Sequence, residues 1–571
     1  MTFWGTFCGQ IARRTMGSVA RTAAAWTRTG MPAPGRVVAV THHGQARSGP
    51  SRRNVLRVGG LAAVVAAVNG PLVGGYALGQ YRTWRHHQVS YERVCGRWDV
   101  VGNSHTNSVH GTMLNTGQVL MVAGSGNNQQ YFDEKVFRSV LLNSARASFT
   151  QVYTPWDAFC CGHTVLPDGR VLFAGGTKKY EVLAPDAPDQ KQHDYQGLKD
   201  SFVFDPAKGD FSRVGSMNHA RWYPTLVTTG DGTVVAVSGL DEKGYIDNGN
   251  TESFDPVGNR WIDHPGLHKV FPTYPALLLV ADGRLFFTSA NAGYGPASVA
   301  ARRSGLWNLR TNDFQDVVGL PQPELNETAA SLLLPPAQDQ KVMFLGGGAN
   351  GDSQVSTART AIVDLSRAKP KWQRGPDMNV KKRYPGAVIL PDDTVLVTNG
   401  STRYRADDSR TSEIYDPADN SFRPAADPYI GRDYHAQYLL LPDGRVVAIG
   451  SNPLRDNNYF ETGVSVYSPP YLFQGPRPSI VAAPTKVARG RTLTFTASGP
   501  VAKVRLMRPG SYTHVTDTEQ RSIALPIVRQ PGETVTVTIP ENPNLVPTNW
   551  YMLFVVDGAG RPSTAAWVHV Q

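Results

Sequence analysis

The chain has 571 residues, of which 56 are Gly and 41 are Pro, and 18% are charged. This length allows two or three domains, or one large repeat domain with a smaller one, and the many turn-forming residues favour short strands over long helices. The formal charge of +11 is carried by residues 1–94, which hold twelve Arg, no Lys and one acid, so the nearly neutral residues 95–571 exclude a basic nucleic-acid-binding body.

The amino-terminal segment predicts a targeting or anchoring device. Residues 1–50 are rich in Arg and Ala and contain no acid, so we expect a disordered basic tail. Arg52 and Arg53 precede residues 58–79, which carry no charge and as a helix would span roughly 33 Å, close to the thickness of a bilayer core. Residues 51–80 are then either a cleaved twin-arginine-like signal or an uncleaved membrane anchor. Both alternatives place the body outside the cytoplasm, secreted or held at the cell surface through this helix.

The body of the chain repeats itself seven times. Each repeat has a turn, then an apolar strand, then a small residue, and successive copies follow at steps of 51 to 63 residues. A period near 50 with Asp-Gly turns is typical of kelch repeats, whose four-stranded units cannot bury both faces alone. We therefore predict an all-β fold with a seven-bladed kelch-type β-propeller over residues 95–473. The strand-end residues are Gly124, Gly176, Gly239, Ala290, Gly347, Gly400 and Ser451.

A second, smaller domain is predicted at the carboxyl end. The period stops after about residue 473, where Pro476 and Pro478 mark a boundary. Alternating apolar residues over 504–507, 535–539 and 550–556 predict strands. We expect residues 474–571 to form an immunoglobulin-like β-sandwich.

Several stretches beside the predicted strands carry side chains that suit metal chemistry. Tyr434 and His435 precede the seventh repeat strand, and a phenolate beside an imidazole suits Cu(II), which takes oxygen and nitrogen donors. Cys160, in a Phe-Cys-Cys-Gly-His stretch, and Tyr223, in an Arg-Trp-Tyr-Pro stretch, precede the second and third repeat strands. His514 lies on a predicted hairpin of the last domain. Because equivalent loops of a propeller lie at one end, we expect the first four side chains to converge.

These stretches resemble the galactose oxidase and glyoxal oxidase family of mononuclear copper-radical oxidases, from about residue 96 to the end. The chain is most similar to the glyoxal-oxidase-like bacterial branch. The resemblance is carried jointly by the motifs Arg-Trp-Tyr-Pro at 221–224, Tyr-His and Leu-Pro-Asp-Gly-Arg within 434–445, and Thr-His-Val-Thr-Asp and Gln-Arg within 513–521.

The resemblance implies a role for each residue. One copper ion would be ligated by Tyr223, Tyr434, His435 and His514. Cys160 would be joined to Tyr223 by a thioether, and this pair would be the radical cofactor. Tyr434 would be the axial ligand and general base. Trp222 would stack on the cross-linked pair and protect its radical.

The implied activity is oxidation of small aldehydes or primary alcohols, including alcohols of cell-surface glycans, with O2 reduced to H2O2. We expect these substrates and O2 as partners, no nucleic acid, and a monomer. Galactose oxidase supplies its stacking Trp from a later stretch; the corresponding place, near Leu240, has none here, so Trp222 takes that role. The sugar-binding domain of galactose oxidase has no counterpart, so galactose specificity is not implied.

Alternatives remain open. Cys161 could compete with Cys160 for the cross-link or pair with Cys95, and His163 and Arg432 could serve catalysis or packing. A second hypothesis is a non-catalytic kelch scaffold that binds a glycan or protein at the cell surface and works without copper. A hydrolase is a weaker alternative, because the motif loops offer no convergent acid pair or nucleophile.

Overall fold

The computed structural model describes residues 88–183, 192–193, 195–246, 249–295, 298–351, 353–452, 460–499 and 501–571. All of them belong to one compact unit, Gly79–Gln571. The predicted tail 1–50 and the predicted signal or anchor 51–80 lie outside the described residues. Within the described ranges, no helix is both long and apolar enough to cross a membrane.

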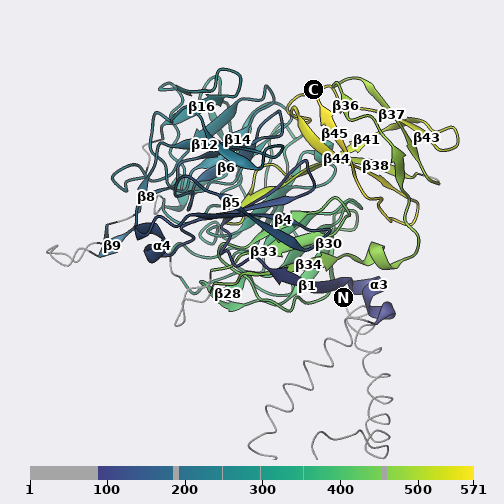
Figure 1. Ribbon diagram of the computed structural model, residues 1–571, viewed down its shortest axis with the longest axis horizontal. Coiled ribbons are helices and arrows are strands. Elements are labelled where there is room, and N and C mark those ends of the chain that lie inside the picture. Colours follow the sequence, from purple (N-terminus) through teal and green to yellow (C-terminus); the bar gives the residue numbers. More distant parts are fainter. Residues whose placement is uncertain are drawn as a thin grey trace, which may run out of the picture. The chain divides into compact units, whose positions relative to one another are not determined.

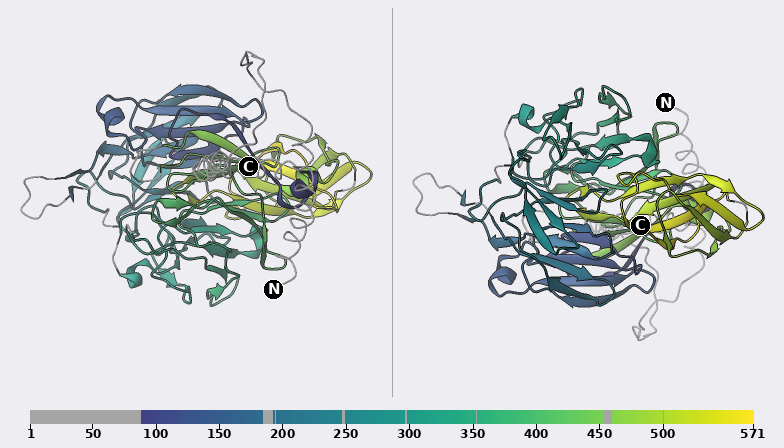
Figure 2. Two further views of the ribbon diagram at one scale, coloured as in Figure 1. Left: turned by 90° about the horizontal axis from the view of Figure 1, so that it is seen from below. Right: turned by 90° about the horizontal axis from the view of Figure 1, so that it is seen from above.

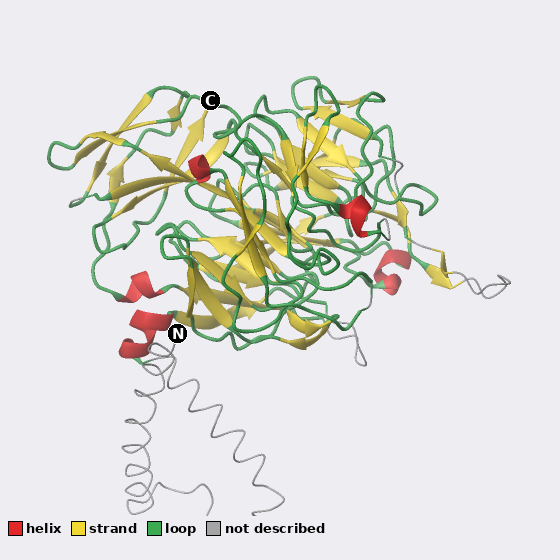
Figure 3. Ribbon diagram, turned by 180° about the vertical axis from the view of Figure 1, so that it is seen from behind, coloured by secondary structure: helices red, strands yellow, loops and turns green. Residues whose placement is uncertain are grey.

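The described chain consists mostly of antiparallel strands, with a few short helical turns (Figure 3). The helical segments are α3 (Val89–Cys95), α4 (Gln129–Asp133), η1 (Val299–Arg302), η2 (Ala337–Asp339) and η3 (Pro470–Phe473). Short strands on connecting loops are β8 (Thr177–Lys179), β9 (Val182–Leu183), β10 (Gln192–His193), β11 (Gln196–Gly197), β28 (Ser401–Arg403) and β29 (Ala406–Asp408).

The described part of residues 97–468 contributes four strands to each of seven sheets, which follow one another along the chain. The first has β2 (His110–Met113), β3 (Val119–Gly124), β4 (Arg138–Asn143) and β5 (Ser148–Tyr153). The second has β6 (Gly162–Val165), β7 (Val171–Ala174), β12 (Ser201–Asp205) and β13 (Asp210–Arg213). The third has β14 (Thr225–Thr228), β15 (Val234–Val237), β16 (Thr251–Asp255) and β17 (Arg260–Asp263).

The remaining sheets repeat this pattern. The fourth has β18 (Leu277–Leu279), β19 (Leu285–Phe287), β20 (Gly305–Trp307) and β21 (Phe314–Asp316). The fifth has β22 (Ala330–Leu333), β23 (Lys341–Leu345), β24 (Thr360–Asp364) and β25 (Gln373–Arg374). The sixth has β26 (Gly386–Ile389), β27 (Val395–Thr398), β30 (Ser412–Asp416) and β31 (Ser421–Pro424). The seventh has β32 (Gln437–Leu440), β33 (Val446–Ile449), β34 (Gly463–Ser468) and β1 (Arg97–Asn103).

Each apolar repeat strand read from the sequence is the second strand of its sheet, and nearly all of its residues are buried. The seventh sheet is completed by the first strand of the chain, since β1 pairs with β34 from Arg97↔Ser468 to Asn103↔Gly463. Such closure leaves few exposed edges. The arrangement is consistent with the predicted kelch propeller.

The carboxyl-terminal residues form two further sheets, which make a lobe beside the others (Figures 1 and 2). One sheet has β35 (Ile480–Ala482), β37 (Thr492–Ala497), β43 (Thr534–Thr538) and β42 (Ile527–Arg529). The other has β36 (Lys486–Val487), β45 (Ala566–Val570), β44 (Asn549–Val556), β38 (Lys503–Arg508) and β41 (Arg521–Leu525). The three strands expected from the sequence are β38, β43 and β44. One buried apolar cluster joins this lobe to the fifth sheet, with Val504 and Ile523 packed in the same core as Val342.

One hairpin of the lobe joins the first sheet. It consists of β39 (Ser511–Thr513) and β40 (Thr516–Asp517). β39 pairs with β2 through His110↔Thr513 and Thr112↔Ser511, which extends that sheet to six strands. Backbone pairing therefore fixes the position of the hairpin turn, which carries His514.

Candidate metal centre

The site residues share one local backbone geometry. Cys160, Tyr223 and His435 each lie two residues before the first strand of their sheet, at β6, β14 and β32, with φ of 61°, 68° and 64°. Tyr384 has the same place before β26, with φ of 54°. This left-handed conformation is uncommon outside Gly, costs on the order of 1–3 kcal/mol, and concentrates at functional sites. The repeat thus presents Cys, Tyr, Tyr and His at the same point of the second, third, sixth and seventh sheets.

His514 reaches the same place from the hairpin. It lies between β39 and β40 with φ of 47°, and Thr513 Oγ1 lies 2.7 Å from its Nδ1. The Asp517 carboxylate accepts hydrogen bonds from the backbone N–H groups of Ser511, Glu519 and Gln520. Asp517 therefore holds the hairpin in place.

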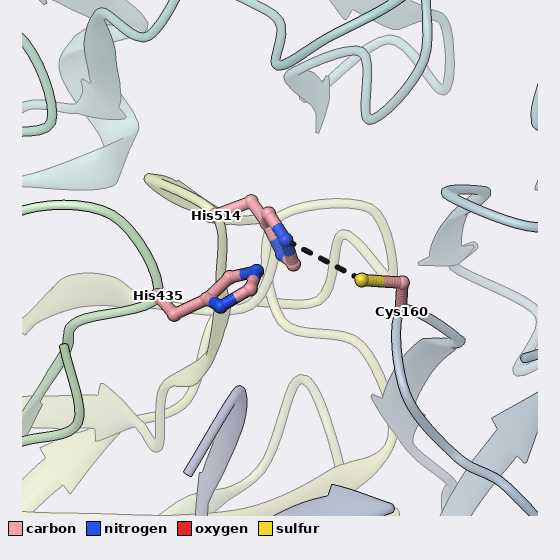
Figure 4. Close-up of side chains that lie close together, drawn as sticks. All are labelled: Cys160, His435 and His514. Atoms are coloured by element: carbon pink, nitrogen blue, oxygen red, sulfur yellow. Dashed lines mark hydrogen bonds between the residues drawn. The ribbon is translucent and has the colours of Figure 1, made fainter. Parts of the chain in front are cut away.

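The predicted ligands converge. His514 Nε2 lies 3.0 Å from the Tyr223 hydroxyl and 3.7 Å from Cys160 Sγ. The hydroxyl groups of Tyr223 and Tyr434 contact each other. Cys160, His435 and His514 each offer a ligand atom within 4.8 Å of the other two, and Figure 4 shows the two imidazoles beside the thiol. Loops that precede the first strands of three sheets, together with the hairpin, thus bring oxygen, nitrogen and sulfur donors to one point.

The electrostatics of this point suit a cation. Burial, followed by the nearby His514 and Arg405, holds the pKa of His435 well below its ordinary value. Burial likewise lowers the pKa of His514, so both imidazoles are neutral and each carries a ring-nitrogen lone pair that can bind a metal. Burial raises the pKa of Tyr223 and of Tyr434 well above the ordinary value, and a bound cation would reverse this by favouring the phenolates.

His435 shows most directly that a metal fits. Its side chain is 1% exposed, and neither Nδ1 nor Nε2 has a hydrogen-bond partner among the described residues. Leaving a buried polar atom unpaired costs about 1–3 kcal/mol, and native proteins rarely accept this without a reason. A metal bound to one ring nitrogen explains this His435 environment, and the two imidazoles and two phenols suit copper.

Trp222 covers the Tyr223 ring. The two ring centroids are 3.8 Å apart and the planes differ by 5°. Trp222 Nε1 donates to Thr177 Oγ1 at 3.0 Å, and its backbone exchanges hydrogen bonds with Leu240. Tyr195 stacks on the other face of Trp222, with centroids 4.3 Å apart and a 5° angle. Sequence reasoning missed Tyr195, because no motif surrounds it.

A cavity of about 530 Å³ adjoins Tyr223 and Tyr434. Its lining includes Arg302 and Arg405, which sequence reasoning also missed. The Arg405 guanidinium lies over the Tyr434 ring, 3.9 Å from the centroid, and donates to the Asn452 carbonyl. The cavity wall therefore places a cation directly on one predicted ligand.

The residues left undecided by the sequence have packing contacts. His163 Nδ1 lies 2.6 Å from Ser511 Oγ on the hairpin. Arg432 donates to the carbonyls of Gly450 and Gly463. Among the described residues the cysteines are free thiols, so the Cys95–Cys161 pair considered above is not formed. Cys161 Sγ instead lies 3.7 Å from His110 Nε2.

Known proteins match most of the chain. Residues 127–471 match the family described as Glyoxal oxidase N-terminus, and residues 477–570 match the Galactose oxidase-like, Early set domain. Galactose oxidase of Gibberella zeae is 26% identical over 448 residues, 74% of this chain and 62% of that protein. Aldehyde oxidase GLOX1 of Arabidopsis thaliana is 28% identical over 408 residues, 61% of this chain and 63% of that protein. The chain thus spans less than two thirds of either relative.

A solved structure shows the same fold. It is described as a novel fungal alcohol oxidase with catalytic diversity among the AA5 family, in complex with copper. It matches with a TM-score of 0.71 and 21% identity, over 84% of this chain and 100% of that one. Because the match at residues 127–471 spans more than half of the chain, the protein belongs to the galactose oxidase and glyoxal oxidase family of copper-radical oxidases.

Proposed function

We propose that this protein is a copper-radical oxidase that converts small aldehydes or primary alcohols to more oxidised products and reduces O2 to H2O2. The observation that carries the proposal is the buried His435 imidazole, which has two unpartnered nitrogens beside Cys160, His514 and the two phenols. Relatives named galactose oxidase and aldehyde oxidase, and a similar fold solved with copper, support it.

Tyr223, Tyr434, His435 and His514 would hold one copper ion. Cys160 would be cross-linked to Tyr223 through a thioether, which lowers the potential of the phenol. When bound, copper supplies a one-electron acceptor and polarises the substrate oxygen. Tyr434, as a phenolate, would take the proton of a substrate alcohol and become a phenol, and the Tyr223 oxygen, as a radical, would take the hydrogen atom from carbon. Trp222, stacked at 3.8 Å, would shield that radical from solvent.

The cavity supports a small polar substrate. Its volume of about 530 Å³ lies in the range of small-molecule sites. Glu327 and Arg405 line its wall, and Arg383 pairs with the Glu327 carboxylate at 3.0 Å. The proposal also includes larger substrates, namely glycans that present a primary alcohol at their ends.

We also propose the finer architecture and location. The seven successive sheets support a seven-bladed kelch propeller over 95–473, and the two final sheets support an immunoglobulin-like domain over 474–571. The paired arginines and uncharged stretch within 51–80 support export, with the body secreted or held at the cell surface as a monomer.

Copper loading and peroxide release test the proposal. Protein loaded with Cu(II) should retain one copper per chain after gel filtration and release H2O2 with a panel of aldehydes and alcohols. Tyr223→Phe should abolish peroxide release, while His219→Gln, outside the site, should keep it. If the metal-free protein still binds its partners and the copper-loaded protein releases no peroxide with any substrate, the results would favour the non-catalytic scaffold.

A further inference from the structure

Three aromatic rings form one continuous stack that begins at Tyr223. Trp222 lies parallel to Tyr223 at 3.8 Å, and Tyr195 lies parallel to Trp222 at 4.3 Å, each with a 5° angle between planes. Tyr180 follows, its centroid 5.1 Å from that of Tyr195. The four side chains include only Trp and Tyr, which are the most easily oxidised aromatic residues.

The outer end of the stack has a proton acceptor. The Tyr180 hydroxyl lies 2.7 Å from Ser125 Oγ, and Ser125 Oγ donates to Asp157 Oδ2 at 2.8 Å. Because Ser125 gives its proton to Asp157, its lone pair is available to accept from Tyr180. An oxidised phenol is a strong acid, so it loses its proton readily along this path. Asp157 Oδ1 accepts only from backbone N–H groups, of Ser125 and Phe159.

The stack also reaches the cavity. Tyr195 lines the cavity wall, and its hydroxyl donates to Asn127, another lining residue, at 3.2 Å. The Tyr195 side chain is 8% exposed, whereas Trp222 is 2% exposed. Trp222 and Tyr223, which is 3% exposed, also line the cavity, so Tyr195 is the most exposed of the three rings and offers a small oxidant the largest contact.

We propose that Trp222, Tyr195 and Tyr180 form an electron relay through which a one-electron oxidant in solution generates the Tyr223 radical. This inference rests on the proposed function, since it assigns the route by which the oxidase becomes active. The oxidant accepts one electron and is reduced by one unit. Tyr223, held as a phenolate by its metal, loses that electron.

The intermediate rings end unchanged. Tyr195 gives an electron to the oxidant in the cavity and takes one from Tyr180, whose proton moves through Ser125 to Asp157. When Tyr180 regains an electron from Tyr195, the proton returns. Tyr195 is restored from Trp222, and Trp222 from Tyr223. One electron and no proton cross the relay in total.

Packing alone does not explain these residue types. Phe would fill the same volume at both positions and would remove two buried hydroxyl groups that need partners. The hydroxyls are instead bonded to Asn127 and to the Ser125–Asp157 pair. The relay accounts for both the parallel stacking and the proton acceptor.

Tyr195→Phe tests the relay with little change of shape. Copper-loaded protein, first reduced to the radical-free state, is mixed with hexacyanoferrate(III), and growth of the radical absorption band is followed by stopped flow. Tyr195→Phe should slow this growth by about tenfold or more, equivalent to about 1.4 kcal/mol in the barrier. Tyr180→Phe should slow it in the same direction. Tyr131→Phe, on α4 and without a ring contact to these residues in the described chain, should match the wild type.

Steady-state turnover after full oxidation is the second measurement. It should be within about twofold of wild type in Tyr180→Phe, because Tyr180 is not among the residues that line the cavity and the relay acts before catalysis. Equal rates of radical growth in wild type, Tyr195→Phe and Tyr180→Phe, with a normal final band, would overturn the relay and leave the oxidase intact. A wild-type protein that forms no radical band with excess oxidant would overturn the proposed function and the relay together.

Discussion

His435→Ala separates a metal ligand from a structural histidine. The wild-type imidazole is buried and makes no ring hydrogen bond within the described chain. Removing it forfeits packing worth about 2–4 kcal/mol. It also removes two unpaired buried nitrogens that cost about 1–3 kcal/mol each. About 2–4 kcal/mol is thus lost against about 2–6 kcal/mol gained, so the metal-free variant should lose no more than about 2 kcal/mol of stability.

Copper should distinguish the two proteins sharply. A ligand at about 100 times its Kd stabilises the folded state by about 2.7 kcal/mol, so wild type should gain that much while His435→Ala gains almost nothing. Thermal unfolding with and without Cu(II), followed by calorimetry, measures both quantities. His163→Ala is the matched control: its Nδ1 contacts Ser511 Oγ at 2.6 Å and Thr112 Oγ1 at 3.1 Å, so the metal-free form should lose stability. An equal copper-induced gain in wild type and His435→Ala would refute the assignment.

Three further predictions concern the cross-link, acid stability and the cavity. Tyr223→Phe should leave Cys160 as a free thiol that reacts with a maleimide after unfolding, whereas copper-treated wild type should not react there. Burial lowers the pKa of His163 from 6.5 to about 3. The unfolded state therefore binds more protons between these values, and stability present above pH 6.5 falls by about 1.4 kcal/mol per unit as pH drops towards 3. Urea unfolding at about pH 7 and about pH 4.5 measures this loss, and the free energy of unfolding should fall less with pH in His163→Gln than in wild type. An equal fall in His163→Gln and in the control His219→Gln would contradict the prediction. Arg405→Gln removes the cation from the Tyr434 ring, and this contact contributes about 0.5–2 kcal/mol. The kcat measured in the peroxide assay should therefore fall by about 2- to 30-fold. An unchanged kcat would contradict a role for the contact.

The repeat was the most predictive part of the sequence. Turns such as Asp168-Gly169 fix hairpins locally, and the apolar strands that follow, β7 among them, must be buried on both faces. The period of the repeat and the order of strands within each hairpin therefore follow from residues that are close together in the sequence. The pairing of β1 with β34 joins residues more than three hundred positions apart, and no local signal in either strand specifies it.

The site was predictable where unusual residues fall at equivalent repeat positions. Cys160, Tyr223 and His435 precede their strands by the same two residues, so one turn geometry brings them together. Tyr195 and Arg405 lie on connecting loops whose paths depend on neighbouring sheets. A single Tyr or Arg in such a loop carries no pattern, and only the folded chain brings it against Trp222 or Tyr434.

The covalent state of Cys160 tests the central claim most directly. Metal-free protein is expressed without copper, incubated with Cu(II) and O2, stripped of metal, digested and analysed by mass spectrometry. The account predicts one linked peptide that contains Cys160 and Tyr223 and weighs ~2 Da less than the two separate peptides, the mass of two hydrogen atoms. Two separate unmodified peptides after full copper loading would contradict the account.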